Sequence, residues 1–345
     1  MKRTALAIAV FLLVPGAFSQ EAKNVQLLKG MSPTQLQRTM NMMRASLGVH
    51  CDFCHLFKDD KWDFASDDKQ EKKIARNMIQ MTMDLNEKYF KRQGVTCNSC
   101  HRGSLHPVAL ASLPQTPPPF PTPPEERPAL PARDEVVAKF VSALGKVDEN
   151  AMSRMELIGT RESPRGKAPI DVVIAPGKIR VTSKNAEGGE LINVFAGDSG
   201  WFRDPKNRGS YNASQLEHMW QVSDAMRFIM PSEIPADAKV TSKDKAGDKD
   251  AWVITMPWGT IGRQRLYFDT TSGLLLKRVM MMATPIGWVP QKTTYDDYRD
   301  VGGFKLPFVV TFDSVDPWIG ATRRYNEIRL NAKIDESVFT KPSTQ

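Results

Sequence analysis

CDFCH at residues 51–55 and CNSCH at residues 97–101 together contain all four cysteines of the 345-residue chain. In each motif, two cysteines three residues apart are followed directly by a histidine. On one turn of helix the two thiols share a face, and the adjacent imidazole can be directed toward the same space. The sequence therefore predicts two chemically equivalent sites, each made by two thiols and one imidazole.

A similar amphipathic helix precedes each motif. The first has Ser32 as N-cap, Pro33 in the first helical position and Gln35 completing a capping box, and it ends at Gly48. The second is expected to open at Asp68. In both helices the apolar residues recur at spacings of 4, 3 and 4, namely at Leu36, Met40, Met43 and Leu47, and at Ile74, Met78, Met81 and Leu85. Residues 24–106 are therefore expected to be an internal duplication of helix, turn and motif.

Cys-x-x-Cys-His is the attachment signature of c-type haem. Two cysteine pairs are also compatible with a zinc site, with disulfides or with redox-active thiols. A zinc site does not require a histidine directly after both pairs, however, and a thioredoxin-like motif would lie in a βαβ context that this segment lacks. We therefore expect two covalently bound haem c groups. Their thioether positions are Cys51, Cys54, Cys97 and Cys100, and their histidine iron ligands are His55 and His101.

The helices offer a sixth iron ligand as well, because the methionine thioether is a common axial partner of histidine in cytochromes. A methionine on a helix face is in general more often ordinary core, but here a Met-x-x-Met pair precedes both motifs. Spacing alone does not choose between Met40 and Met43, or between Met78 and Met81. Met42 does not belong to the apolar face that carries Met40 and Met43.

Three other side chains are weaker candidates for contact with the haems. His50 and His106 lie close to the motifs and are alternative axial ligands, although such histidines are more often surface residues. Arg102 follows the second motif directly and is expected to pair with a haem propionate.

The segment from about Val25 to Pro107 resembles a known family. It carries Met-Ser-Pro-x-Gln-Leu at residues 31–36 and Gly-Val-Thr-Cys-Asn-Ser-Cys-His-Arg-Gly at residues 94–103. These features are similar to the cytochrome subunit of photosynthetic reaction centres and, more closely, to its two-haem relatives in non-photosynthetic bacteria. The resemblance implies that the first Met of each pair, Met40 and Met78, is the sixth ligand. The photosynthetic subunit carries four haems and commonly a lipidated N-terminal cysteine, so no docking to a reaction centre is inferred.

Residues 1–19 read as a cleavable signal peptide, with Lys2 and Arg3, an apolar run from Ala5 to Val14 and the small-x-small sequence at residues 17–19. We expect export to a bacterial periplasm and no membrane-spanning segment. The formal net charge of +8 does not indicate nucleic-acid binding, because positive and negative residues are interspersed and no basic block occurs.

The rest of the chain is expected to form a separate unit, which makes the fold class α+β. The sequence predicts an all-α dihaem domain at residues 20–106, a proline-rich linker at 107–133 and a β-rich domain at 134–345. A short helix is expected at residues 135–144 and a longer one at 214–230. Alternation predicts strands at 170–174, 178–182, 191–196, 252–256, 265–269, 274–282, 291–298 and 308–312.

Turn and strand patterns at residues 266–275 and 295–308 are similar to the lipoprotein-carrier (LolA-like) class, which implies a curved antiparallel half-barrel. Folds of this class often enclose an apolar cavity, so lipid or quinone binding is a possible role. Met280, Met281 and Met282, with Trp258, Trp288 and Trp318, are candidate lining residues. The alternative is that they pack the core or rim of an ordinary sheet.

The leading functional hypothesis is a periplasmic electron carrier with no catalytic residues and with redox proteins as partners. If both irons have two axial ligands, no coordination site is left for a substrate. Two alternatives remain: a dihaem peroxidase-like enzyme, which needs an open iron, and a lipid- or quinone-binding protein whose haems sense redox state.

Overall fold

The computed structural model describes residues 22–59, 61–90, 94–107, 129–146, 148–185, 187–211, 216, 226, 229–258, 262–316 and 320–342. The expected signal peptide, most of the linker, most of the helix expected at 214–230 and Trp318 lie outside these ranges. Within the described part of the chain, no helix is long and apolar enough to cross a membrane.

The N-terminal unit consists mainly of helices. Its elements are α1 (Pro33–Leu47), the 3-10 turn η2 (Cys51–Phe53), β1 (Leu56–Lys58), β2 (Lys61–Asp63), α2 (Gln70–Lys88) and α3 (Cys97–His101). α1 begins as predicted, because the Ser32 hydroxyl accepts a hydrogen bond from Gln35 N and the Gln35 side chain accepts one from Ser32 N at 2.9 Å. Gly48 ends it with a φ of 68°.

Two expectations for this unit were wrong in detail. It is not all-α, because β1 and β2 form an antiparallel hairpin in which Phe57 pairs with Trp62. α2 begins at Gln70 rather than at Asp68, and its N-cap Lys69 makes no side-chain capping bond. The nearby carboxylate of Asp67 instead forms an ion pair with Arg76 at 2.7 Å.

The C-terminal unit is one antiparallel sheet preceded by α4 (Arg133–Leu144) and α5 (Glu149–Met152). Each segment that alternation singled out coincides with a strand. The strands are β3 (Met155–Ser163), β4 (Gly166–Ala175), β5 (Lys178–Lys184), β6 (Glu190–Ala196), β7 (Ser199–Arg203), β8 (Arg208–Ser210), β9 (Lys239–Ala246), β10 (Lys249–Trp258), β11 (Gly262–Asp269), β12 (Leu275–Thr284), β13 (Gly287–Val301), β14 (Phe304–Ser314) and β15 (Ala321–Leu330).

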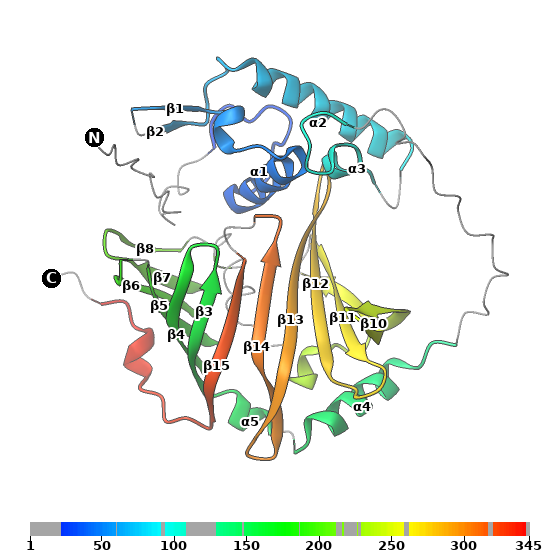
Figure 1. Cartoon of the computed structure of the whole chain (residues 1–345), viewed down its shortest axis with the longest axis vertical. Coiled ribbons are helices and arrows are strands. Elements are labelled where there is room, and N and C mark those ends of the chain that lie inside the picture. Colours follow the sequence, from blue (N-terminus) through cyan, green and yellow to red (C-terminus); the bar gives the residue numbers. More distant parts are fainter. Residues whose placement is uncertain are drawn as a thin grey trace, which may run out of the picture.

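The sheet is built from two meanders that meet in its middle. The strand order is β8-β7-β6-β5-β4-β3-β15-β14-β13-β12-β11-β10-β9, so the last strand of this sheet, β15, pairs with its first, β3. α4 lies at the lower end of the sheet in Figure 1 and buries Val136, Phe140 and Leu144 in the main core. The ring of Phe140 lies 5.0 Å from that of Phe268 on β11.

The two units share an apolar cluster, which we call the junction cluster. Its buried members come from both units and are Leu28, Met42, Met43, Ile79, Met280, Met282, Ile286 and Val289. Figure 1 shows the N-terminal helices lying across the end of the sheet at the tips of β12 and β13. The proline-rich linker was expected to join independent units, but these units are packed against each other.

The junction cluster explains the methionine run on β12. Successive strand residues point to opposite faces, so Met280 and Met282 share a face, and both are buried against the N-terminal unit. They pack a core rather than line a cavity. Trp288 lies under the exposed guanidinium of Arg263, with 4.6 Å between the guanidinium carbon and the ring centre.

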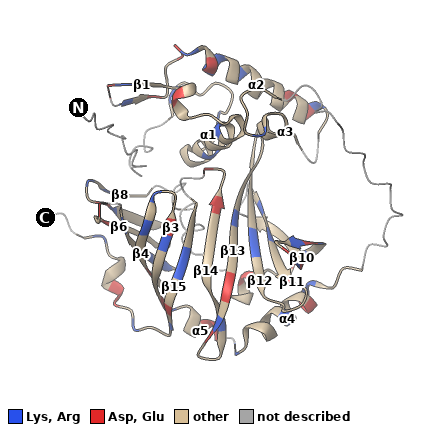
Figure 2. Ribbon diagram, viewed as in Figure 1, with Lys and Arg blue, Asp and Glu red and all other residues tan. Residues whose placement is uncertain are grey.

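Charged residues of both signs are interspersed along α2 and over the strands (Figure 2). No helix or strand in the drawing carries a long run of one sign.

Gly287, at the start of β13, provides a test of the junction. Its φ is +108°, and a Cβ there would lie 2.3 Å from the Thr96 Cγ2 atom. We expect Gly287→Ala to lower the free energy of unfolding by about 2–3 kcal/mol, since both backbone strain and this clash must be relieved. The matched control is Gly177→Ala, where φ is +66° and no atom lies within 4 Å. There we expect a loss of only about 1 kcal/mol. If urea unfolding gave the two variants equal losses of unfolding free energy, the tight contact at Gly287 would be contradicted.

Candidate haem-binding site

The first motif forms a tight turn directly after α1. Cys54 N and His55 N both donate to the carbonyl oxygen of Cys51, at 3.3 and 3.0 Å. Cys51 and Cys54 are free thiols, and burial raises the pKa of each. The turn keeps the two thiols and the imidazole of His55 within one short segment.

The ring of His55 is held by its surroundings. Its Nδ1 atom is buried without a hydrogen-bond partner of good geometry, and its ring meets that of Phe64 edge-on at 5.1 Å. Trp62 in turn stacks on Phe64, with 5.4 Å between the centres of the two rings. Burial lowers the pKa of His55, which favours the neutral imidazole that a metal requires.

The second motif forms α3, which begins with a local cap. Thr96 N donates to the Ser99 hydroxyl at 3.0 Å, and Ser99 N donates to the Thr96 carbonyl at 2.9 Å. At the other end, Nδ1 of His101 lies 3.1 Å from the carbonyl oxygen of Ser104. A carbonyl accepts only from a protonated nitrogen, so Nε2 is left as the acceptor that can coordinate a metal. This arrangement fits an axial histidine.

The C-terminal end of α1 packs directly on the second motif. Gly103 N donates to the Ser46 carbonyl at 2.8 Å. A Cβ at Gly48 would lie 2.2 Å from the Gly103 oxygen, so only glycine allows this approach. The helix that leads into the first motif is therefore also the support of the second.

The connection before the second motif is the longer of the two, and Asn86 closes it. The Asn86 side chain donates to Val95 O at 2.9 Å and accepts from Val95 N at 2.7 Å. The sequence marks Asn86 as the start of this longer loop but assigns no role to its side chain.

The methionines on the helices fall into two environments. Met42 and Met43 are buried in the junction cluster, and Met40 is partly buried at its margin. On α2, the apolar stripe faces outward: Ile74, Met78 and Met81 are 51%, 40% and 45% exposed. Three large apolar side chains exposed on one helix face indicate a surface that another group covers.

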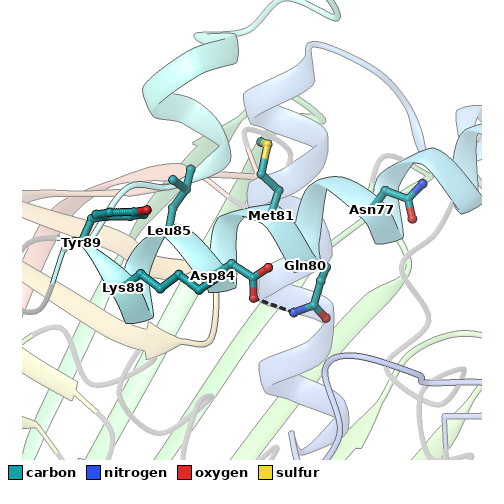
Figure 3. A pocket seen from close by; sticks show the side chains of 7 residues that line it. All are labelled: Asn77, Gln80, Met81, Asp84, Leu85, Lys88 and Tyr89. Carbon is teal, nitrogen blue, oxygen red and sulfur yellow. Dashed lines mark hydrogen bonds between the residues drawn. The ribbon is translucent and has the colours of Figure 1, made fainter.

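This face of α2 also carries an open cavity of about 400 Å³. Figure 3 shows Met81, Leu85 and Tyr89 along one side of the helix, with Gln80 and Asp84 on the other side joined by a hydrogen bond of 2.9 Å. The remaining lining residues are Asn77 and Lys88. Met81, Leu85 and Tyr89 give this open surface an apolar side against which a flat, hydrophobic macrocycle such as haem can pack.

The weaker candidates lie at the surface. His50, His106 and Arg102 are exposed, and Arg102 ends α3 in the left-handed conformation with a φ of 50°. None of the four cysteines forms a disulfide. Among the described residues, no group of three or more His, Cys, Asp or Glu side chains is arranged to hold a metal ion by itself.

Comparison with known proteins supports the resemblance of the N-terminal segment. Residues 16–119 match the family described as the photosynthetic reaction centre cytochrome C subunit. The chain is 36% identical over 88 residues to cytochrome c-554 of Chloroflexus aurantiacus, covering 24% of this chain and 20% of that protein. It is 32% identical over 94 residues to the photosynthetic reaction center cytochrome c subunit of Thermochromatium tepidum, covering 26% of this chain and 22% of that protein. The chain thus spans about a fifth of the length of these relatives.

Two solved structures are similar to about three fifths of this chain. A LolA superfamily protein from Nitrosomonas europaea covers 61% of this chain and 98% of its own, at 13% identity and a TM-score of 0.42. A putative outer membrane lipoprotein-sorting protein domain from Vibrio parahaemolyticus matches over 59% of this chain and 94% of its own, at 10% identity and a TM-score of 0.40.

Proposed function

We propose that this protein, whose residues 16–119 match the reaction centre cytochrome family, is a periplasmic c-type cytochrome that carries electrons through two covalent haems. The observation that carries the proposal is the pair of complete attachment motifs, folded as short turns in one unit beside two methionine-bearing helices. The relatives share only this segment, so the assignment of function rests on the residues of the site.

Each haem would be held by the side chains of one motif. Cys51 and Cys54 would form the thioethers at the first site, and Cys97 and Cys100 at the second. When bound, each haem supplies a reversible one-electron iron couple, and an axial methionine raises its potential. His101 is already oriented by the Ser104 carbonyl, and the edge of Phe64 restricts His55.

Met40 and Met78 are the proposed axial methionines. Burial of Met43 in the junction cluster supports Met40, since the Met43 side chain is engaged in packing with the sheet. At the second site Met78 and Met81 are both exposed, and the family resemblance favours the first of the pair. Arg102, exposed next to His101, is proposed to pair with a propionate.

Redox proteins are the proposed partners, and the haem-bearing unit is the surface that they meet. A lipid or quinone site in the sheet does not enter this proposal, because Met280 and Met282 pack in the junction cluster.

The decisive experiment separates a carrier from a catalyst. If both irons have protein ligands on both sides, the reduced protein should bind carbon monoxide slowly and incompletely, and peroxide turnover should stay at background rates. Stopped-flow spectroscopy and a peroxidase assay measure both. Rapid stoichiometric carbon monoxide binding, together with peroxide turnover that His101→Gly abolishes, would instead make the second site catalytic.

A further inference from the structure

A largely buried ion pair crosses the junction between the two units. Arg44 Nη2 on α1 lies 2.9 Å from Asp316 Oδ1, in the segment between β14 and β15. The two side chains are 14% and 8% exposed. The pair between Lys292 and Asp313, by contrast, has a similar distance of 3.0 Å but side chains 47% and 51% exposed.

Arg44 lies where α1 passes into the first motif. Its carbonyl oxygen accepts hydrogen bonds from the backbone N–H groups of Gly48 and Val49, which end the helix. Cys51 follows two residues later. A change in the position of Arg44 therefore moves the chain that presents the first motif.

Both charges of the pair act on Cys51. Burial raises the pKa of the Cys51 thiol, the Arg44 guanidinium opposes this effect, and the Asp316 carboxylate adds to it. At the second motif, burial raises the pKa of Cys97, and the charge that acts on it is that of Cys100. Both charges of the pair therefore act on the Cys51 thiol, whereas neither acts on that of Cys97.

Because the pair is largely removed from solvent, each of its charges acts strongly on nearby groups. In a low-dielectric junction each charge is weakly screened, so the two fields cancel at the motif only while both are present. Removal of one side chain therefore takes away one of the two opposing charges beside the first motif.

We propose that Asp316 is a positioning residue of the first haem motif, through which the C-terminal sheet holds Arg44 and balances its charge, and so sets the reduction potential of the first redox centre. This inference rests on the proposed function. It makes the sheet a part of the first haem site instead of an appended domain.

Charge substitutions in the full-length, haem-loaded protein test the inference by spectroelectrochemical titration. Asp316→Asn leaves a positive charge that favours the reduced state, so the potential of one centre should rise. Arg44→Gln leaves a negative charge and should lower the potential of that same centre. The double variant should have a potential close to that of the wild type. Asp316→Glu keeps the charge, so its potential should also be close to the wild-type value. The second centre and the matched control Asp313→Asn should show no shift.

Urea unfolding of the same proteins gives a readout that does not depend on redox activity. Each single substitution should lower the urea midpoint more than the double variant does, because removing one charge of a largely buried ion pair costs more than replacing both. Shifts of the same sign in the two single variants, shifts at both centres, or no shift would overturn the inference, even with two normal redox centres. A wild-type protein without redox-active centres would overturn the proposed function and, with it, this inference.

Discussion

Replacing Cys51 and Cys54 with serine will leave the protein with one covalently bound haem, whereas the wild type will carry two. Each motif supplies its own pair of thiols, and the structure gives each motif its own backbone turn. Loss of one pair removes both covalent attachments at that site and leaves the other pair intact. Intact-mass measurement under denaturing conditions, after expression with the haem-attachment machinery, counts the groups directly.

The matched control is the pair of replacements at Cys97 and Cys100, which should also leave one haem, at the other site. Replacement of all four cysteines should leave none. A wild-type mass with a single haem, or variants that lose both haems at once, would contradict two self-sufficient attachment motifs.

Met40→Ala and Met78→Ala will each change the coordination of one iron and lower its reduction potential, because a methionine ligand raises that potential. Met78 is 40% exposed, so its replacement should cost little folding free energy. Absorption and magnetic circular dichroism spectra report the loss of the thioether ligand, and redox titration reports the potential.

Met42→Ala is the control for these substitutions. Met42 is only 3% exposed and lies in the junction cluster. Its replacement should therefore lower the free energy of unfolding by about 2–5 kcal/mol without changing either iron spectrum. Altered coordination in Met42→Ala, or unchanged spectra in the first two variants, would move the ligand assignment to Met43, Met81 or a histidine.

The sequence by itself determined the local parts of this protein. A capping box and a C-terminal glycine fix α1 through bonds within a few residues, and the structure confirms them. The Cys-x-x-Cys-His motifs carry their chemistry in five consecutive residues. Alternation identified strands such as β5 and β6, where one face is buried and the other is not. It missed five strands of the sheet, namely β3, β7, β8, β9 and β15. Of these, β9 is an edge strand made largely of exposed polar residues, and β15 has a sequence rich in charge.

Only the tertiary structure decided how the two units meet. Arg44 and Asp316 are 272 residues apart, and no local pattern links them. The same holds for Met280 and Met282, which alternation places on one face of β12 without saying that α1 covers that face. Helix caps and strand alternation are local, because they depend on backbone geometry over a few residues. The pairing of β15 with β3 and the packing of α1 on β12 and β13 depend instead on which apolar surfaces remain to be buried once the whole sheet has formed.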